Sequence, residues 1–423
     1  MKLKRLLALS VIALMVFAVT GCSSSSKGNQ GAAGGKTVIN YFSFSATPDH
    51  EKQLDQMIQA FEKKNPNIKV NSELVSYNDY FTKLQTRIAG GQAPDVFELN
   101  YENFVQYASK GTLADLSGFI NNDKEFKPDQ FNQQAYKAFQ YNGKQYGMVE
   151  SFSNVLTFYN KDLFDKAGVS YPTADWTWND EVAAAKKLTD SKNKVWGTYA
   201  PVTMNEFYKV AAQNGGQIFD KNGDVTINSP QNLEALTYMV DKVNKYKISP
   251  SPADLSGQTP EDLFKNGKLA ILHTGIWEFD AFKDVPFKWD VQLEASNTQK
   301  AHNFFANGLV VSKDSKVQEA AYKFAEFMSA SEDVAKTRID SSWELPAITN
   351  NDILKPYFEK TPPANKKAVF EALNSLVLPP VVENWSKISD ATDKEFQKAL
   401  NGEETSKQAL ETLNSEYKGL LNK

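Results

Sequence analysis

The chain has 423 residues, of which 41% are hydrophobic and 12% aromatic, and its formal net charge is −4. This length predicts two or three domains, and the acidic balance excludes the basic surface that a nucleic-acid-binding protein needs. The single cysteine excludes an intrachain disulfide, and the three histidines are too far apart in sequence for a zinc site, so we expect neither a metal nor a cofactor.

The N-terminus has the order of a secretory signal. A basic start precedes an apolar run over residues 6–19, which is shorter than the roughly 20 residues that span a bilayer. The sequence Val19-Thr20-Gly21-Cys22 follows and is similar to the lipobox of bacterial lipoproteins, whose cysteine carries the lipid after cleavage. The pattern predicts a lipoprotein signal peptide over residues 1–21, with Cys22 as the site of lipid attachment.

Residues 22–36 are rich in serine and glycine and have no apolar periodicity. Such a composition is typical of a flexible tether. We therefore expect a globular body to begin near Thr37, attached by its lipid to the extracytoplasmic face of the bacterial cell membrane.

The body begins with β-rich runs that alternate with amphipathic stretches. Strands are predicted over residues 38–44, 68–75 and 95–99. Between them lie a helix opened by Thr47-Pro48, with an apolar face of Leu54, Met57, Ile58 and Phe61, and a helix over residues 79–89. This βαβαβ order predicts a parallel sheet covered by helices.

A second series of elements follows residue 146. Its predicted strands cover residues 146–149, 155–159, 269–273 and 308–312, and its helices begin after Thr177 and Asn205, at Ser229-Pro230 and at Thr259-Pro260. Two more helices are predicted near residues 317–328 and 331–338, and roughly the last 60 residues have helical periodicity. The fold class is therefore α/β in two lobes, with a helical C-terminal part.

Several segments resemble, in order, the extracellular solute-binding proteins (family 1) of carbohydrate ABC importers, which include maltodextrin- and multiple-sugar-binding lipoproteins. Gly90 to Asn100 is similar to the family's G-x-x-P-D-V phrase, and residues 146–164 to its Y-G-x-P and Y-N-K-D-L-F region, with Met148-Val149 where proline is usual. The other matching segments are residues 172–181, residues 264–277 with the G-x-W triplet, and residues 320–327 followed by 345–347. Together they cover nearly all of residues 37–423.

The resemblance implies a fold like that of periplasmic binding proteins, with two lobes joined by three hinge crossings. Lobe 1 would be residues 37–150 plus 306–345, and lobe 2 residues 151–305 plus 346–423. A carbohydrate, above all an oligosaccharide, would bind between lobes that close by a hinge motion. The closed form would then deliver it to the integral-membrane permease subunits of an ABC importer, and the protein would be a monomer without enzymatic activity.

A sugar has apolar C–H faces and a rim of hydroxyl groups, so its site needs aromatic side chains together with carboxylates and amides. In α/β sheets such groups lie in loops at the carboxyl ends of strands. The candidate ligand-binding residues are Phe44, Asp79, Asn100, Tyr101, Glu150, Trp277, Glu278, Trp343 and Trp385. The resemblance places a stacking aromatic at Trp277.

Most candidates have a structural alternative. Asn100 and Tyr101 could form a surface cap. Trp277, Trp343 and Trp385 could pack in the core, because large aromatic residues are highly buried on average. Asp79 could be a helix N-cap, and Glu150 could be a hinge residue that serves backbone amides.

One other class of function stays open at this point. A lipid-anchored surface glycoside hydrolase needs only a pair of carboxylates, which a chain with 51 acidic residues can always offer. Neither a G-x-S-x-G nor an H-E-x-x-H motif is present, which argues against other hydrolases.

Overall fold

The computed structural model describes residues 35–45, 50–348 and 351–421. The chain divides into two units, Met1–Gly35 and Lys36–Lys423, and the fold below is that of the second. The predicted signal peptide, Cys22 and nearly all of the predicted tether lie outside the described residues, as does Thr47-Pro48. Every described helix is too short or too polar to be a membrane span.

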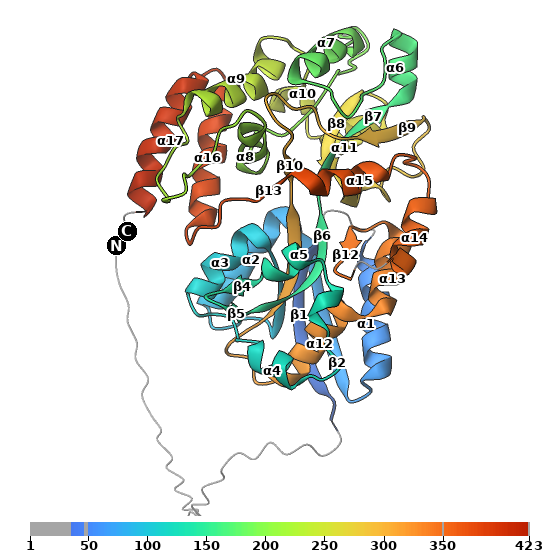
Figure 1. Cartoon of the computed structure of the whole chain (residues 1–423), viewed down its shortest axis with the longest axis vertical. Helices are drawn as coiled ribbons and strands as arrows, with labels where there is room; N and C mark the ends of the chain where they lie inside the picture. Colours follow the sequence, from blue (N-terminus) through green and yellow to red (C-terminus); the bar gives the residue numbers. More distant parts are fainter. Residues whose placement is uncertain (1–34, 46–49, 349–350, 422–423) are drawn as a thin grey trace, which may run out of the picture. The chain divides into compact units, whose positions relative to one another are not determined.

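A six-stranded sheet forms the lower part of the body in Figure 1. Its first three strands, β1 (Thr37–Ser45), β2 (Ile68–Ser76) and β3 (Val96–Asn100), are parallel, with β1 in the middle. This confirms the predicted βαβαβ unit. The strand order is β12-β6-β11-β3-β1-β2, completed by β6 (Gly147–Ser153), β11 (Phe305–Val311) and β12 (Leu345–Pro346).

A second sheet has three antiparallel strands in the order β8-β7-β9: β7 (Val155–Asn160), β8 (Ile271–Gly275) and β9 (Trp289–Gln292). Only Asn154 separates β6 from β7, so the chain passes directly from the first sheet to the second. Glu150 therefore lies inside β6, and the prediction that it stands at the crossing is wrong. The run from residue 147 to 160 has no glycine or proline after its start to mark the change.

Two short ladders complete the β structure. β4 (Gln140–Tyr141) pairs with β5 (Lys144–Gln145), and β10 (His302–Asn303) pairs with β13 (Leu376–Val377). The second ladder joins two segments more than 70 residues apart, immediately before β11.

The helices around the first sheet bury the faces that the sequence predicts. In α1, the residues Leu54, Met57, Ile58 and Phe61 are all buried. The helices of this part are α1 (His50–Lys64), α2 (Tyr77–Ala89), α3 (Tyr101–Ser109), α4 (Ser117–Asn122), α5 (Gln133–Lys137), α12 (Gln318–Ala330), α13 (Glu332–Ser341) and α14 (Asn351–Glu359), with the 3₁₀ turn η1 (Pro128–Gln130).

The helices around the second sheet include the predicted C-terminal set. α7 begins with a capping box, in which Thr177 Oγ1 accepts a hydrogen bond from the Asp180 amide at 3.3 Å and Asp180 Oδ2 accepts one from the Thr177 amide at 2.9 Å. The elements are α6 (Lys161–Ala167), α7 (Trp178–Leu188), α8 (Met204–Gln213), α9 (Pro230–Asn244), α10 (Pro252–Leu255), α11 (Pro260–Lys265), η2 (Ile276–Glu278), α15 (Lys367–Ala372), η3 (Leu373–Ser375), α16 (Trp385–Leu400) and α17 (Ser406–Leu421).

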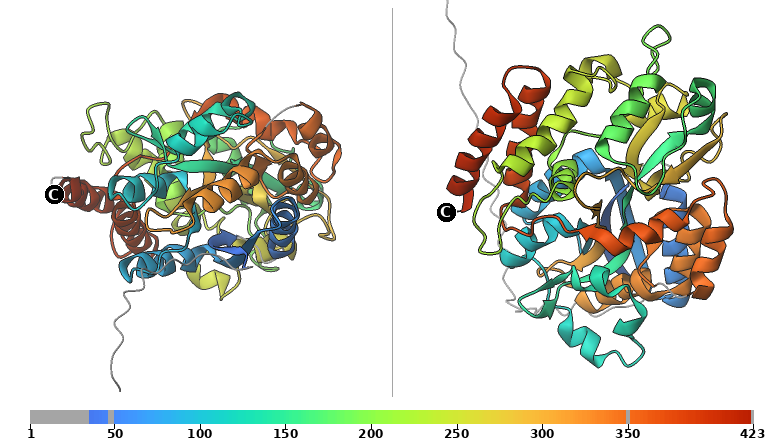
Figure 2. Two further views of the ribbon diagram at one scale, coloured as in Figure 1. Left: turned by 90° about the horizontal axis from the view of Figure 1, so that it is seen from below. Right: turned by 45° about the horizontal axis from the view of Figure 1, so that its top comes forward.

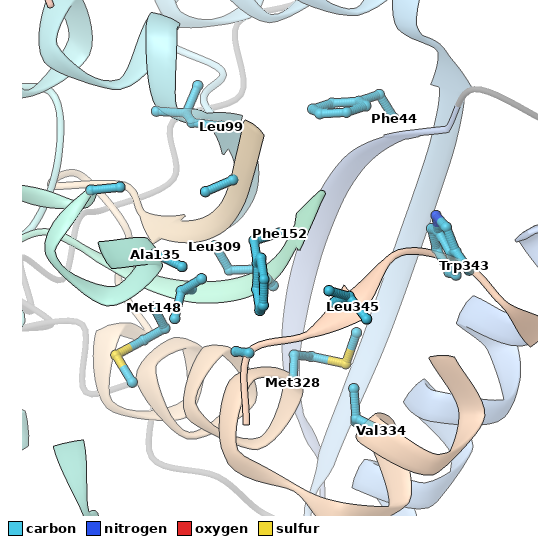
Figure 3. Packing of buried hydrophobic residues seen from close by; sticks show 14 of the residues in the cluster. Phe44, Leu99, Ala135, Met148, Phe152, Leu309, Met328, Val334, Trp343 and Leu345 are labelled. Atoms are coloured by element: carbon cyan, nitrogen blue, oxygen red, sulfur yellow. The ribbon is translucent and has the colours of Figure 1, made fainter. Parts of the chain in front are cut away.

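The buried hydrophobic residues form separate clusters. The largest fills the space between the six-stranded sheet and its helices, where Phe152, Leu309 and Leu345 lie close to Met328 (Figure 3), and it continues into the three-stranded sheet through residues such as Phe158 and Val291. A second cluster lies among α8, α9, α16 and α17, which pack side by side in Figure 2. The C-terminal helices thus share a core with α8 and α9 and do not share one with the first sheet.

Candidate functional site

An aromatic pair stands at the crossing between the two sheets. Trp277 lies in η2, just after β8, and its ring centroid is 5.9 Å from that of Phe305, the first residue of β11. The sheets bring them together, because Gly275 pairs with Val155 and Phe305 pairs with Ser153, on the two sides of the crossing. Both rings are only half-buried, so each keeps a surface on which the apolar face of a sugar could stack.

Gly275 determines where the Trp277 ring lies. A Cβ atom at residue 275 would come within 2.1 Å of the indole, which therefore packs directly against the glycine backbone. Any other residue at 275 would push the ring away. The G-x-W spacing thus has a steric cause in this fold.

A chain of hydrogen bonds gathers polar side chains at the carboxyl end of β3. Asn100 is buried, donates from Nδ2 to the hydroxyl of Tyr77 at 3.0 Å and accepts from Nδ2 of Asn103 at 2.9 Å. Tyr101 is half-buried at the start of α3. The structure therefore brings the two predicted residues Asn100 and Tyr101 to the edge of the sheet where α/β proteins bind ligands.

The same edge contacts elements from the second half of the chain. Gln106 Nε2 of α3 donates to Ser386 Oγ of α16 at 2.8 Å. Asp393, also in α16, accepts a hydrogen bond from the Met204 amide at the start of α8 at 2.6 Å, and burial raises the pKa of Asp393 to about 6. Helices α3, α16 and α8 therefore meet at the end of β3.

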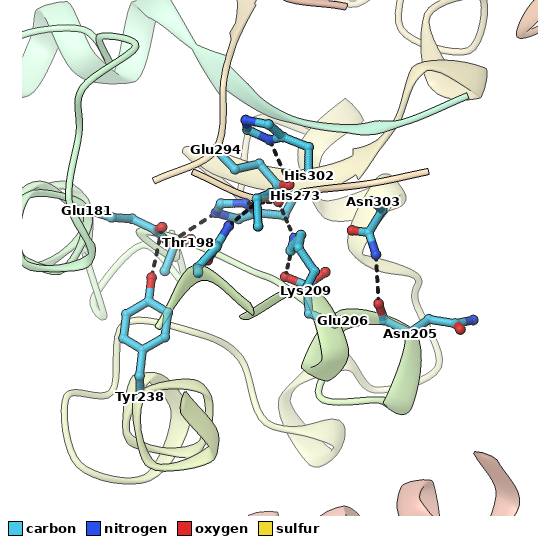
Figure 4. A network of polar contacts seen from close by, with 12 residues as sticks. Glu181, Thr198, Asn205, Glu206, Lys209, Tyr238, His273, Glu294, His302 and Asn303 are labelled. Carbon is cyan, nitrogen blue, oxygen red and sulfur yellow. Dashed lines mark hydrogen bonds and ion pairs between the residues drawn. The ribbon is translucent and has the colours of Figure 1, made fainter. Parts of the chain in front are cut away.

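Four polar residues at this meeting point were missed by the sequence reasoning: Glu102, Asn205, Tyr208 and Asn303, called here the polar cluster. Asn303 Nδ2 donates to the Asn205 carbonyl at 2.9 Å, as Figure 4 shows. The hydroxyl of Tyr208 lies close to the Asn303 amide, and after burial the Glu102 carboxylate is the strongest influence on the raised pKa of Tyr208. Only Glu102 had a sequence signal, because it directly follows Asn100-Tyr101.

The polar cluster has hydrogen-bonding capacity that the described residues do not use. Four of its buried atoms have no hydrogen-bond partner of good geometry there: Glu102 Oε2, Asn205 Oδ1, Tyr208 Oη and Asn303 Oδ1. The Glu102 side chain is deeply buried, and this burial raises its pKa to about 7. Buried polar atoms without partners are uncommon in folded proteins, so this group is a candidate binding surface.

Glu150 and Trp343 belong to a buried ionic cluster. Arg338 Nη2 lies 2.5 Å from Glu150 Oε1, and Arg338 Nη1 lies 3.7 Å from Glu344 Oε2. The Trp343 ring lies 4.5 Å from the Arg338 guanidinium and stacks on His50 at 4.3 Å. Burial raises the pKa of Glu150, although Arg338 opposes this. We therefore reassign Glu150 from a predicted ligand acceptor to the partner of Arg338, and Trp343 to the packing around it.

Trp385 and Phe44 pack against other residues. Trp385 is 2% exposed inside the second core cluster, so we reassign it from a sugar platform to the core. Phe44 is 8% exposed, and its ring centroid lies 5.2 Å from that of Tyr77 and 5.0 Å from that of Tyr80. The Phe44 ring therefore packs edge-on against the Tyr77 ring.

Asp79 and Glu278 have contrasting surroundings. Asp79 is exposed as the third residue of α2 and accepts a hydrogen bond from Ser76 Oγ at 3.0 Å. Because Ser76 is the N-cap, the alternative that made Asp79 the cap is wrong. Glu278 is buried next to Trp277, and burial, with a contribution from Glu261, raises its pKa to about 8.

His273, a residue of β8, belongs to a second buried ionic cluster (Figure 4). Its Nε2 lies 3.1 Å from Glu181 Oε1 and its Nδ1 lies 3.0 Å from Glu294 Oε1. Lys209 contacts both Glu206 and Glu294. Burial would lower the pKa of His273, but Glu181 and Glu294 outweigh it and raise this pKa to about 9. Both ring nitrogens of His273, the middle residue of β8, are therefore satisfied by carboxylates.

Two hollows lie at the surface of the described residues. A groove of about 450 Å³ is lined by Tyr208 and by residues of the segment 377–382, in which Leu378 and Val381 are exposed. A hollow of about 550 Å³ lies at the amino ends of β1 and β2, beside Lys64 and Lys316. Of these two, only the groove adjoins the polar cluster.

Comparison with known proteins identifies the family of this fold. Residues 47–335, more than half of the chain, match the family model for bacterial extracellular solute-binding proteins. The ABC substrate-binding protein Lmo0181 from Listeria monocytogenes, solved in complex with cycloalternan, is 65% identical, with a TM-score of 0.90 over 92% of this chain and 99% of that chain. Maltose-bound MalE3 of T. maritima is 22% identical, with a TM-score of 0.81 over 91% of this chain and 100% of that chain. The predicted fold class is thereby confirmed.

A full-length relative points to the same family. The arabinooligosaccharide-binding protein of Bacillus subtilis (strain 168) is 26% identical over 97% of this chain and 98% of its own length. The chain therefore belongs to the bacterial extracellular solute-binding protein family, whose members bind a solute and are not enzymes.

Proposed function

We propose that this protein captures cycloalternan, or an oligosaccharide closely similar to it, outside the cell and delivers it to the permease of an ABC importer. The observation that carries this proposal is the 65% identity to Lmo0181, whose structure contains cycloalternan. The relatives named for arabinooligosaccharides and maltooligosaccharides are 26% and 22% identical. These sugars are therefore the competing ligands, while the membership in a family of binding proteins removes the hydrolase alternative.

The geometry at the sheet crossing supports an oligosaccharide ligand. The half-exposed rings of Trp277 and Phe305 offer apolar surface, and the polar cluster offers carboxylate, phenol and amide groups. Aromatic faces beside a few convergent polar groups match the two kinds of surface that a sugar presents.

The two sheets supply the lobes of this proposal. The first sheet carries β3 and α3, with Asn100 and Glu102, and the second core cluster carries α8 and α16. Rotation about the Asn154 crossing would separate and rejoin these elements around the sugar. We therefore propose this crossing, instead of residue 150, as the first boundary between the lobes.

We also propose that Cys22 carries a lipid that holds the protein at the membrane. The supporting observations are the lipobox-like sequence at residues 19–22 and a relative of Streptococcus pneumoniae (strain ATCC BAA-255 / R6), named a maltooligosaccharide ABC transporter solute-binding lipoprotein, which is 22% identical over 96% of this chain and 95% of its own length. Replacing Cys22 with alanine should move the protein from the membrane fraction to the medium. Unchanged membrane retention would refute the lipid anchor.

The ligand is tested by titration calorimetry and thermal unfolding of residues 36–423, which contain the whole described core. Cycloalternan is compared with linear maltooligosaccharides and arabinooligosaccharides of similar size. At about 100 times its dissociation constant, the cognate sugar should stabilise the protein by about 2.7 kcal/mol. If a linear sugar binds more tightly than cycloalternan, the proposed ligand is wrong; if no sugar binds, the carbohydrate function is wrong.

A further inference from the structure

We propose that Glu102, Tyr208 and Asn303 form a subsite that binds the hydroxyl groups of a neutral sugar, next to the aromatic pair. This inference rests on the proposed function and adds two points to it. It names the residues that bind the hydroxyl groups of the ligand, and it predicts a preference for neutral over acidic sugars.

The first argument is the unused hydrogen-bonding capacity of these side chains. Glu102 is 2% exposed, Tyr208 3% and Asn303 0%, yet Glu102 Oε2, Tyr208 Oη and Asn303 Oδ1 each lack a hydrogen bond of good geometry among the described residues, although the Tyr208 hydroxyl lies close to the Asn303 amide. A buried polar atom without a partner destabilises the folded chain, because it has lost its hydrogen bonds to water without replacement. Three such atoms in one place therefore favour a ligand that supplies the missing partners.

The second argument is the origin of the three side chains. Glu102 lies in α3, directly after β3 of the first sheet, whereas Tyr208 lies in α8 and belongs to the second core cluster. Asn303 lies in β10 and is tied to α8 by its hydrogen bond to the Asn205 carbonyl. The subsite is therefore assembled from both halves of the fold, and a ligand enters it when these halves are apart.

The third argument is continuity with the aromatic pair. Asn303 and Phe305 are two residues apart in an extended segment, so alternation places their side chains on the same side. Phe304, between them, is fully buried and packs near Phe152, with ring centroids 6.2 Å apart. A sugar ring stacked on Phe305 and Trp277 would thus have its edge near Asn303.

The fourth argument is the chemistry of the three groups. Glu102 Oε2 and Asn303 Oδ1 accept hydrogen bonds, and the Tyr208 hydroxyl both donates and accepts. Hydroxyl groups, which also do both, satisfy this set. A carboxylate on the sugar would instead face the Glu102 carboxyl group, which is ionised above its pKa of about 7 and forms no ion pair with a cation among the described residues. Neutral sugars are therefore preferred to uronate-containing ones.

The test compares conservative variants by calorimetry with cycloalternan. Tyr208→Phe removes only the hydroxyl and should weaken binding by roughly threefold to tenfold, and Glu102→Gln should weaken it by about tenfold or more, as expected for neutral and charged hydrogen bonds. Tyr107→Phe is the matched control, because the hydroxyl of Tyr107 is also buried without a hydrogen bond of good geometry but lies further along α3, close to Gln85. This variant should bind as the wild type does.

The outcomes separate the two proposals. If the wild type binds cycloalternan but Tyr208→Phe and Glu102→Gln bind with unchanged affinity, the subsite is refuted and the proposed function stands. If the wild type binds none of the sugars, the proposed function fails and the subsite fails with it. A uronate-containing oligosaccharide that binds at least as tightly as its neutral counterpart refutes the preference for neutral sugars. Thermal unfolding of each ligand-free variant checks that it is folded.

Discussion

The buried cluster around His273 predicts how stability depends on pH. It contains three carboxylates, Glu181, Glu206 and Glu294, and three groups that can be cations, Lys209, Lys242 and His273. The formal charges of these six groups therefore balance only when His273 is protonated. Loss of that proton would leave an uncompensated negative charge in the protein interior, which is costly.

The size of the effect follows from the pKa of His273. Folding raises this pKa from its ordinary value of 6.5 to about 9, which corresponds to about 3 kcal/mol of stability at 1.36 kcal/mol per pH unit. Because the folded-state pKa is the higher one, the full contribution is present below pH 6.5 and is lost as the pH rises through about 9. His302 also lies 3.8 Å from Glu294, and Tyr238 donates to Glu181 at 3.0 Å.

The assay is urea unfolding of the wild type and of His273→Gln at intervals from pH 6 to 10. The difference in free energy of unfolding between the two should shrink by about 3 kcal/mol between pH 6.5 and 9. Both proteins contain the same other groups that titrate in this range, so the contributions of those groups to the free energy of unfolding cancel in the difference. Thr198→Val is the control, because it removes a hydrogen bond of 2.8 Å to Glu181 without removing a titratable group, and it should shift the curve without changing its slope. A difference that stays constant over this range would refute the charge balance.

Three further changes test other parts of the fold. Gly275→Ala should weaken sugar binding at least about tenfold in calorimetry, which corresponds to about 1.4 kcal/mol, because the new methyl group displaces the Trp277 ring. In a protein that already carries Trp277→Ala, the same change should cause no further loss of affinity. A further loss would contradict this explanation. Arg338→Met should lower the free energy of unfolding by about 3–5 kcal/mol, because it leaves buried carboxylates without their cation, and unchanged urea unfolding would argue against this role. Thr177→Ala should cost about 1 kcal/mol through the lost cap of α7, and an unchanged melting temperature would show that the cap contributes nothing.

The elements that the sequence predicts well are those specified by local pattern. The first βαβαβ unit and the buried face of α1 follow from alternation and helical spacing, and both are confirmed. The insertion of β11 between β3 and β6 has no local signal, because the partners of β11 lie roughly 150 to 200 residues earlier in the chain.

In the candidate site, too, local pattern predicts some residues, whereas others are brought together only by contacts between distant parts of the chain. Asn100 and Tyr101 could be found because they end a predicted strand, where ligand groups gather. Trp277 and Trp385 could not be told apart, since the exposure of an aromatic ring depends on which elements pack around it. Tyr208 and Asn303 were missed because only the folded chain brings α8 and β10 to the end of β3.

The single residue between β6 and β7 makes the length of this crossing critical. Asn154 also donates from Nδ2 to the Val369 carbonyl at 2.7 Å, so the connection has no slack. An insertion of one residue here would leave one sheet intact and turn every side chain of β7 to the opposite face relative to β6, because strand side chains alternate. Trp277 and Phe305 would then lose their common face. Reporter domains for a sugar sensor therefore belong in surface turns, and this crossing should be left at its natural length.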